Sequence, residues 1–254
     1  MISPSRAARR RRRGGAVCIV ALLLAGCTTT APPRPPPPAL PDGPDARLAV
    51  VRAREEQVHT LRARFVSVAR LPDGERSADG VLLIAKPDRF RLRLMLPFGF
   101  TVFDYLNVGE RTWTALPLAD ASQRDRAGEF APFSRDDLGQ AFLRGPYAFP
   151  GQCDAAPAPG DRVWVSCREG DELHRTLLID RVGIVEETSY EAGAPRLVIR
   201  YADYRAVGAT ALPFRITLDY RQRRQSVDIT IQSYELNPTL ADALFQPLEG
   251  EVGS

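Results

Sequence analysis

The sequence has few of the side chains on which catalysis usually depends. It contains two histidines, His59 and His174, and a single lysine, Lys86, among 254 residues. It has no G-x-S-x-G nucleophile elbow, no glycine-rich phosphate loop and no H-E-x-x-H zinc motif. We therefore expect no catalytic residue, no metal and no cofactor, and we expect both histidines to be surface or capped residues.

The acidic pairs are poorly placed for acid–base chemistry. They occupy positions 55–56, 136–137 and 186–187. Adjacent residues point to opposite faces of a strand and diverge on a helix, whereas two catalytic carboxylates must flank one substrate bond. We interpret all three pairs as parts of solvated faces.

The sequence also lacks an apolar run of the roughly 20 residues that a membrane-spanning helix needs. The apolar stretch at residues 16–24 is shorter, follows six arginines and ends in Leu24-Ala25-Gly26-Cys27. This order is typical of a secretory signal, and its last four residues resemble the lipobox of bacterial lipoproteins. We expect residues 1–26 to be removed and Cys27 to carry the lipid anchor.

Removal of this signal changes the charge of the chain. The signal holds six arginines and no acid, so the formal net charge of +3 becomes 3 − 6 = −3 in the mature chain. The basic character of the full sequence therefore belongs to the signal. We expect no nucleic-acid partner.

Residues 27–44 follow as the lipidated cysteine and a proline-rich tether, which favours extended polyproline II structure. Cys18 leaves with the signal, so Cys153 and Cys167 remain as an even pair in an oxidising compartment. A structural disulfide is the default interpretation. A redox pair or metal ligands are the alternatives, although the spacing is not C-x-x-C and no histidine lies near.

Residues 45–250 are expected to form one domain made mainly of β-strands. Asp45 is expected to cap a helix, and a second helix is expected to begin at Ser134. The segment 90–96 alternates apolar residues with arginines, as a strand with one buried face does. Many strands and few helices predict an incomplete antiparallel β-barrel of about ten to eleven strands, with helices as its lid. The apolar stripe of the first helix is expected to consist of Leu48, Val51, Val58, Leu61 and Phe65.

An apolar turn follows the alternating strand, with the sequence Met95-Leu96-Pro97-Phe98-Gly99-Phe100. Turns usually carry polar residues because they run over the surface. Phe98 is therefore either tucked back onto the core, which general principles favour, or presented outward to an apolar partner such as acyl chains or a bilayer.

At this turn the sequence resembles the LolB family of outer-membrane lipoprotein receptors. The resemblance rests on Asp88-Arg89-Phe90-Arg91-Leu92 followed by Pro97-Phe98-Gly99, on residues 138–146, and on Tyr201-Ala202-Asp203-Tyr204 followed by Leu212-Pro213 and the alternating strand at 227–231. It implies an apolar cavity that holds the acyl chains of a cargo lipoprotein. The periplasmic carrier LolA and related sensor proteins share this fold.

The resemblance also implies roles for individual residues. Phe98 takes the place of the protruding leucine of LolB, with Leu96 and Phe100 beside it in a membrane-insertion loop. Lys86 takes the place of the arginine that latches the lid in LolA, although lysine lacks the planar guanidinium fork. The acyl-binding cavity is expected to be lined by Phe90, Leu92, Leu94, Leu138 and Phe142, the last two on the lid, unless these residues simply pack a core.

The sequence leaves three hypotheses for function. The first is a LolB-like monomer that accepts acylated lipoproteins from a LolA-like carrier and inserts them in the outer membrane, from its periplasmic face. The second is a lipid-binding envelope sensor or lipid carrier of the same fold. The third is a structural envelope lipoprotein. By resemblance to enterobacterial sorting, Thr28 after Cys27 favours the outer membrane.

Overall fold

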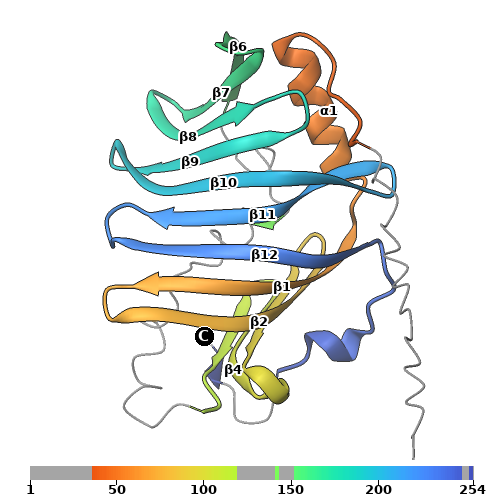
Figure 1. Cartoon of the computed structure of the whole chain (residues 1–254), viewed down its shortest axis with the longest axis vertical. Coiled ribbons are helices and arrows are strands. Elements are labelled where there is room, and N and C mark those ends of the chain that lie inside the picture. The colour runs from red at the N-terminus through yellow and green to blue at the C-terminus, as the bar shows by residue number, and fades with distance from the viewer. Residues whose placement is uncertain (1–35, 119–140, 143–151, 248–251, 254) are drawn as a thin grey trace, which may run out of the picture. The chain divides into compact units, whose positions relative to one another are not determined.

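The protein is described by a computed structural model at residues 36–118, 141–142, 152–247 and 252–253. They belong to a compact unit that runs from Arg34 to Ser254 (Figure 1). Its elements are α1 (Pro44–Glu56), β1 (Thr60–Leu71), β2 (Gly74–Ala85), β3 (Arg89–Met95), η1 (Pro97–Gly99), β4 (Thr101–Val108), β5 (Arg111–Ala115), β6 (Gln152–Ala158), β7 (Arg162–Glu169), β8 (Glu172–Ile179), β9 (Ile184–Glu191), β10 (Ala194–Val207), β11 (Thr210–Tyr220), β12 (Gln225–Leu236), η3 (Asp242–Phe245) and β13 (Val252–Gly253).

The strands form one antiparallel sheet in the order β13-β5-β4-β3-β2-β1-β12-β11-β10-β9-β8-β7-β6. Most neighbours in the sheet are also neighbours in sequence, and β1 pairs with β12 at its centre. Among the described residues the edge strands β13 and β6 have one partner each, so the sheet is unclosed. The predicted incomplete antiparallel barrel is confirmed, with 13 strands among the described residues instead of the ten to eleven expected.

The first helix is shorter than the sequence suggested. It ends at Glu56, and Leu61 and Phe65 lie on β1, where every second side chain is buried. The prediction was wrong because Leu61 and Phe65 are four residues apart. Residues four apart lie on the same face of a helix, and they also lie on the same face of a strand. The predicted cap was wrong as well. The N-cap residue is Gly43, with φ of 91°, no side chain caps the helix, and Asp45 lies in its first turn.

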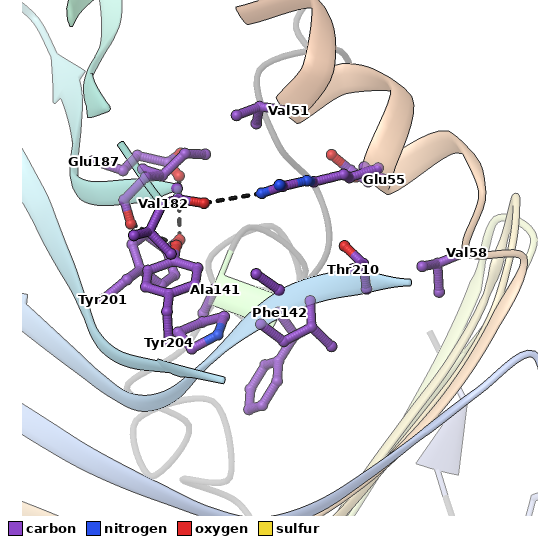
Figure 2. A pocket seen from close by; sticks show the side chains of 16 residues that line it. Val51, Glu55, Val58, Ala141, Phe142, Val182, Glu187, Tyr201, Tyr204 and Thr210 are labelled. Carbon is purple, nitrogen blue, oxygen red and sulfur yellow. Dashed lines mark hydrogen bonds between the residues drawn. The ribbon is translucent and has the colours of Figure 1, made fainter. Parts of the chain in front are cut away.

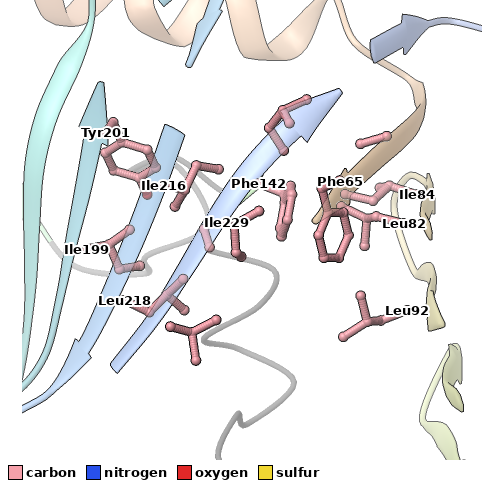
Figure 3. Close-up of a cluster of buried hydrophobic side chains, with 14 of the residues drawn as sticks. Phe65, Leu82, Ile84, Leu92, Phe142, Ile199, Tyr201, Ile216, Leu218 and Ile229 are labelled. Carbon is pink, nitrogen blue, oxygen red and sulfur yellow. The ribbon is translucent and has the colours of Figure 1, made fainter. Parts of the chain in front are cut away.

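The main hydrophobic core lies on one face of the curved sheet. Figure 3 shows Ile199, Ile216 and Ile229 facing Leu82 and Leu92 across the core, with Phe65 and Phe142 between them. These residues share one face because the side chain of every second residue in a strand points to the same side of the sheet. Phe90, Leu92 and Leu94 of β3 share this face, as predicted, and Arg91 and Arg93 point to the other one.

Helix α1 covers the β6–β8 end of the sheet with a second apolar cluster that includes Leu48 and Val51. Arg47 is 1% exposed. Its guanidinium donates to the Pro41 carbonyl at 2.9 Å and to the backbone carbonyl and carboxylate of Asp161, both at 2.6 Å. Leu40, inside the predicted tether, is buried in the same cluster. The helix is thus fixed to the β6–β8 end at several points, among them the turn between β6 and β7.

The C-terminal segment packs on the opposite face of β2–β4. Phe245 of η3 is buried against Leu83 and Leu106 in a third cluster. Arg91 donates to the carbonyls of Leu244 and Gln246, at 2.9 and 2.8 Å, and holds the segment in place. This contact covers the outer face of the sheet next to the apolar turn.

Candidate functional site

The turn at residues 96–100 presents apolar side chains to the surroundings. Phe98 is 97% exposed, Phe100 60% and Leu96 39%. The turn is closed by two backbone hydrogen bonds, from Leu96 N to the Phe100 carbonyl at 2.8 Å and from Gly99 N to the Leu96 carbonyl at 3.1 Å. Phe98 therefore has the outward orientation that the resemblance favours, and not the tucked one.

The backbone of Phe98 is itself unusual. Its φ of 73° lies in the left-handed region, where a bulky side chain is uncommon and costs about 1–3 kcal/mol. The turn accepts this conformation while the ring makes no core contact that would offset the cost. The strain and the exposure together mark the turn as a functional candidate.

The predicted cavity wall of β3 is packed in this structure. Phe90 and Leu92 are buried in the main core, and Leu94 packs against it, partly buried. The Phe90 ring meets Tyr105 edge-on, with centroids 6.0 Å apart. These residues thus contact one another as core, and the hollow beside α1 has other lining residues.

That hollow lies between α1, the start of β9, the end of β10 and the start of β11 (Figure 2). Ala141 and Phe142 form the side opposite α1. Phe142 is 7% exposed and its ring centre lies 5.6 Å from that of Phe65. Phe142 therefore separates the hollow from the main core. Leu138, the other predicted lid residue, lies outside the described residues.

The hollow has a buried polar wall that the sequence reading assigned to solvent. Glu187 is 1% exposed and lies 3.1 Å from Arg175, measured from Oε1 to Nε. The Tyr201 hydroxyl donates to Glu187 Oε2 at 3.3 Å. Burial raises the pKa of Glu187 to about 7, although the Arg175 guanidinium acts to lower it. The interpretation of 186–187 as a solvated pair was thus wrong, because strand alternation turns one of two adjacent residues inward.

Tyr204 and Arg54 complete the polar rim of the hollow. The Tyr204 hydroxyl donates to the Ile184 carbonyl at 2.6 Å, and burial raises its pKa far above the usual range. Arg54 donates to the Val182 carbonyl at 2.9 Å (Figure 2), and partial burial lowers its pKa. No motif marks these residues, since their roles depend on the contact between α1 and the sheet.

Lys86 connects α1 to the sheet. Its ammonium donates to the backbone carbonyl of Glu55 at 2.7 Å and lies 3.8 Å from the Glu55 carboxylate. Burial lowers the pKa of Lys86, while Glu55 acts to raise it. The residue predicted as a lid latch therefore holds the last turn of the helix that lines the hollow. A single carbonyl acceptor does not require the planar fork of arginine.

The remaining predicted residues fall into two groups. Cys153 and Cys167 form a disulfide between directly opposed positions of β6 and β7. Cys27, with the signal and most of the tether, lies outside the described residues. Within the described ranges no group of three potential ligands is placed to hold a metal, and no helix there is long and apolar enough to cross a membrane.

Comparison with known proteins identifies the fold. No family model matches the sequence, and no curated protein matches it. A LolA superfamily protein from Nitrosomonas europaea is similar in structure, with a TM-score of 0.56 and 12% identity over 79% of this chain and 97% of that one. An outer membrane lipoprotein-sorting protein domain from Vibrio parahaemolyticus is also similar, with a TM-score of 0.55 and 14% identity over 78% of this chain and 94% of that one.

A DUF1329 family protein from Desulfovibrio piger is also similar, with a TM-score of 0.54 and 12% identity over 81% of this chain and 98% of that one. At such identities the similarity concerns the fold. The chain has the LolA-like fold: one mainly β, unclosed antiparallel sheet with a helix at its mouth.

Proposed function

We propose that this protein is a LolB-like envelope lipoprotein, which accepts acylated lipoproteins from a LolA-like carrier and inserts them in the outer membrane. Its fold is that of LolA superfamily proteins and of a lipoprotein-sorting domain. The proposal includes lipid on Cys27, a position on the periplasmic face, action as a monomer and the absence of any covalent step.

The exposed turn is the observation that carries this proposal. Phe98, Phe100 and Leu96 place three large apolar side chains together on the surface, where Phe98 alone is 97% exposed. Clustered exposed apolar groups mark interaction sites in soluble domains. The strained backbone holds the Phe98 ring in solvent. Contact of the ring with an apolar partner, such as a bilayer or an acyl chain, would offset this cost.

Cargo binding needs the inner face of the sheet to open. The hollow beside α1 holds about 100 Å³, whereas pockets for ligands of drug size usually measure about 300–1,000 Å³. Phe142 separates it from the main core. In our proposal acyl chains displace Phe142 and enter between the two walls of the core. Transfer is then driven by burial of these chains in the bilayer, at about 0.8 kcal/mol per CH₂.

The small hollow also favours one alternative. A domain whose only task is structural would have the packed core that Phe90, Leu92 and Phe142 form here. Native mass spectrometry of the chain from residue 28, purified from the envelope, separates the two. Bound acyl species support the proposal, and their absence after incubation with acylated lipoprotein supports the structural alternative.

Replacement of Phe98 tests the insertion step directly. Phe98→Glu should reduce transfer of cargo to vesicles at least a hundredfold, because a charge replaces the apolar contact, while cargo binding is unchanged. Phe98→Leu is the matched control and should retain transfer. Normal insertion by Phe98→Glu refutes the insertion-loop proposal. It then favours the lipid carrier or sensor function, provided that acyl binding persists.

A further inference from the structure

Four arginines form two rows on the face of the sheet opposite the main core, beside the 96–100 turn. In one row Arg64 and Arg93 flank Val81, and in the next Arg62 and Arg91 flank Leu83. Strand spacing and rise make this grid roughly 7 by 10 Å between backbone positions. The centre of the grid is therefore apolar and its corners are cationic.

A hollow of about 580 Å³ lies over this grid. Among the described residues its lining includes Arg62, Arg91 and Arg93 and no carboxylate. The rest of the lining, apart from Gln246, is apolar and consists of Val81, Leu83, Met95, Ala243, Leu244 and Pro247. A ligand with an anionic group and an adjoining apolar part matches both kinds of surface.

The acids that pair with these arginines lie at the flanks of the grid. Glu235, on β12, accepts from Arg62 at 3.0 Å. Asp104, on β4 and fully buried, accepts from Arg91 and Arg93 at 2.7–2.9 Å. Arg64 is exposed, and no carboxylate of the described chain lies within ion-pair distance of it. Arg91 is buried and also donates to the Leu244 and Gln246 carbonyls. The less buried Arg62, Arg64 and Arg93 are therefore the arginines that can contact a ligand.

This hollow is continuous with the exposed turn. Val81 and Met95 also line a neighbouring hollow of about 320 Å³, together with Arg64, Leu96 and Phe98. Asp79 is the one acid in that second lining. Arg93 precedes Met95 by two residues, which is about 7 Å along a strand. The apolar turn and the arginines are therefore close enough to contact the acyl chains and the headgroups of one membrane surface, a boundary about 5–10 Å deep.

We propose that the arginine grid binds the phosphate of an anionic membrane phospholipid while Phe98 enters the acyl region. This inference rests on the proposed insertion function and defines the surface on which insertion occurs. The guanidinium fork matches phosphate oxygens in pairs, and the apolar floor accepts the glycerol and the first methylenes of the lipid. Apolar insertion and basic contact are the two signals that together give stable binding to a membrane surface.

The test is flotation of the lipid-free chain from residue 28, which keeps the whole compact unit, with vesicles of two compositions. One is phosphatidylcholine alone, and the other contains phosphatidylglycerol as a third of its lipid. We expect tighter binding to the anionic vesicles. The double variant Arg64→Gln/Arg93→Gln should bind them roughly thirtyfold more weakly, and Arg64→Gln alone roughly fivefold.

The controls separate a site from general attraction. Arg221→Gln/Arg223→Gln removes two exposed arginines from the β11–β12 turn and should leave binding within twofold. An equal loss in this control, or no loss in Arg64→Gln/Arg93→Gln, overturns the proposal. Arg64→Gln removes no described ion pair, and its circular dichroism spectrum should match that of the unchanged protein. Competition by millimolar inorganic phosphate also overturns it, because the site would then take free phosphate.

The outcome is independent of acyl binding. Native mass spectrometry of Arg64→Gln/Arg93→Gln should show the same bound acyl species as the unchanged protein. If no acyl species bind to either form while the anionic preference persists, the proposed transfer function fails and the phosphate site stands. If acyl binding persists without the preference, the site fails and the transfer function stands.

Discussion

The two ends of the sheet are built in opposite ways. At the β6–β8 end, α1 covers the strands, Arg47 is buried among three acceptors, and a disulfide joins β6 to β7. At the β2–β4 end, Phe98 and Phe100 face outward, and polar contacts lie behind them on the outer face. The closed end is covered by a helix and a disulfide, whereas the other end exposes apolar side chains beside a buried Arg91–Asp104 pair.

The largest effect on stability is expected at Asp104, which holds the open end. Asp104→Ala leaves the buried Arg91 without its carboxylate, and such a change costs about 3–5 kcal/mol. Chemical unfolding monitored by circular dichroism measures it. The control is Arg62→Ala, which removes the exposed pair with Glu235 and should cost less than about 1 kcal/mol. Similar costs for both would mean that the open end does not depend on buried charge.

Loss of the disulfide should weaken the closed end. Cys153 and Cys167 are 14 residues apart, and a loop of about this length stabilises by about 3 kcal/mol in the chain-entropy model. Cys153→Ala/Cys167→Ala should lower the free energy of unfolding by that amount, and reduction of the unchanged protein should act likewise. Vesicle binding through the 96–100 turn should be unaffected. A parallel loss of vesicle binding would mean that the two ends are coupled.

Stability should fall as the pH rises through the range that Glu187 governs. Its pKa is about 7 in the folded chain and near 4.5 when unfolded, so the folded state favours the protonated form. That contribution is fully present below pH 4.5 and is lost towards pH 7, a change on the order of 3 kcal/mol. Unfolding curves at pH 4.5–7.5 measure it.

The Glu187→Gln variant is the control for this window and should flatten the slope. Asp161 and Asp228 have lowered pKa values through arginine contacts. Their contributions are lost as the pH falls below 4, outside the window and with the opposite sign. A slope that persists unchanged in Glu187→Gln would assign it to other groups.

The smallest expected effect concerns the strain of the turn. Phe98→Gly should raise stability by about 0.5–1 kcal/mol, because glycine accepts a positive φ without cost. Gly99→Ala should do the reverse, since Gly99 has a φ of 82° and lies in open space. Thermal unfolding of both variants gives the comparison. If Phe98→Gly is destabilising, the ring makes contacts that its exposure does not reveal.

Part of this architecture follows from local pattern. The alternation of Phe90, Arg91, Leu92 and Arg93 predicted the two faces of β3, since each residue reports its own side of a strand. The end of α1 and the start of β1 did not follow, because Leu61 and Phe65 fit both periods. Local pattern therefore identifies faces better than boundaries.

The site shows the same division. Phe98 attracted attention as a large apolar residue in a Pro-x-Gly turn, and the structure places it outside. Glu187 gave no such signal, because its burial depends on Arg175 and Tyr201 from two neighbouring strands. The pairing of Lys86 with the Glu55 carbonyl likewise depends on the position where α1 ends. Contacts between distant segments are not encoded in any local spacing.

The unclosed sheet has a consequence for self-association. An open edge invites further strands, and natural proteins block such edges with proline, covering helices or short strands. Strand β6 contains Pro157, which has no N–H to offer, and α1 packs along it. At the other edge β13 is only Val252–Gly253 long. The unclosed sheet therefore leaves little template for the growth of a fibril.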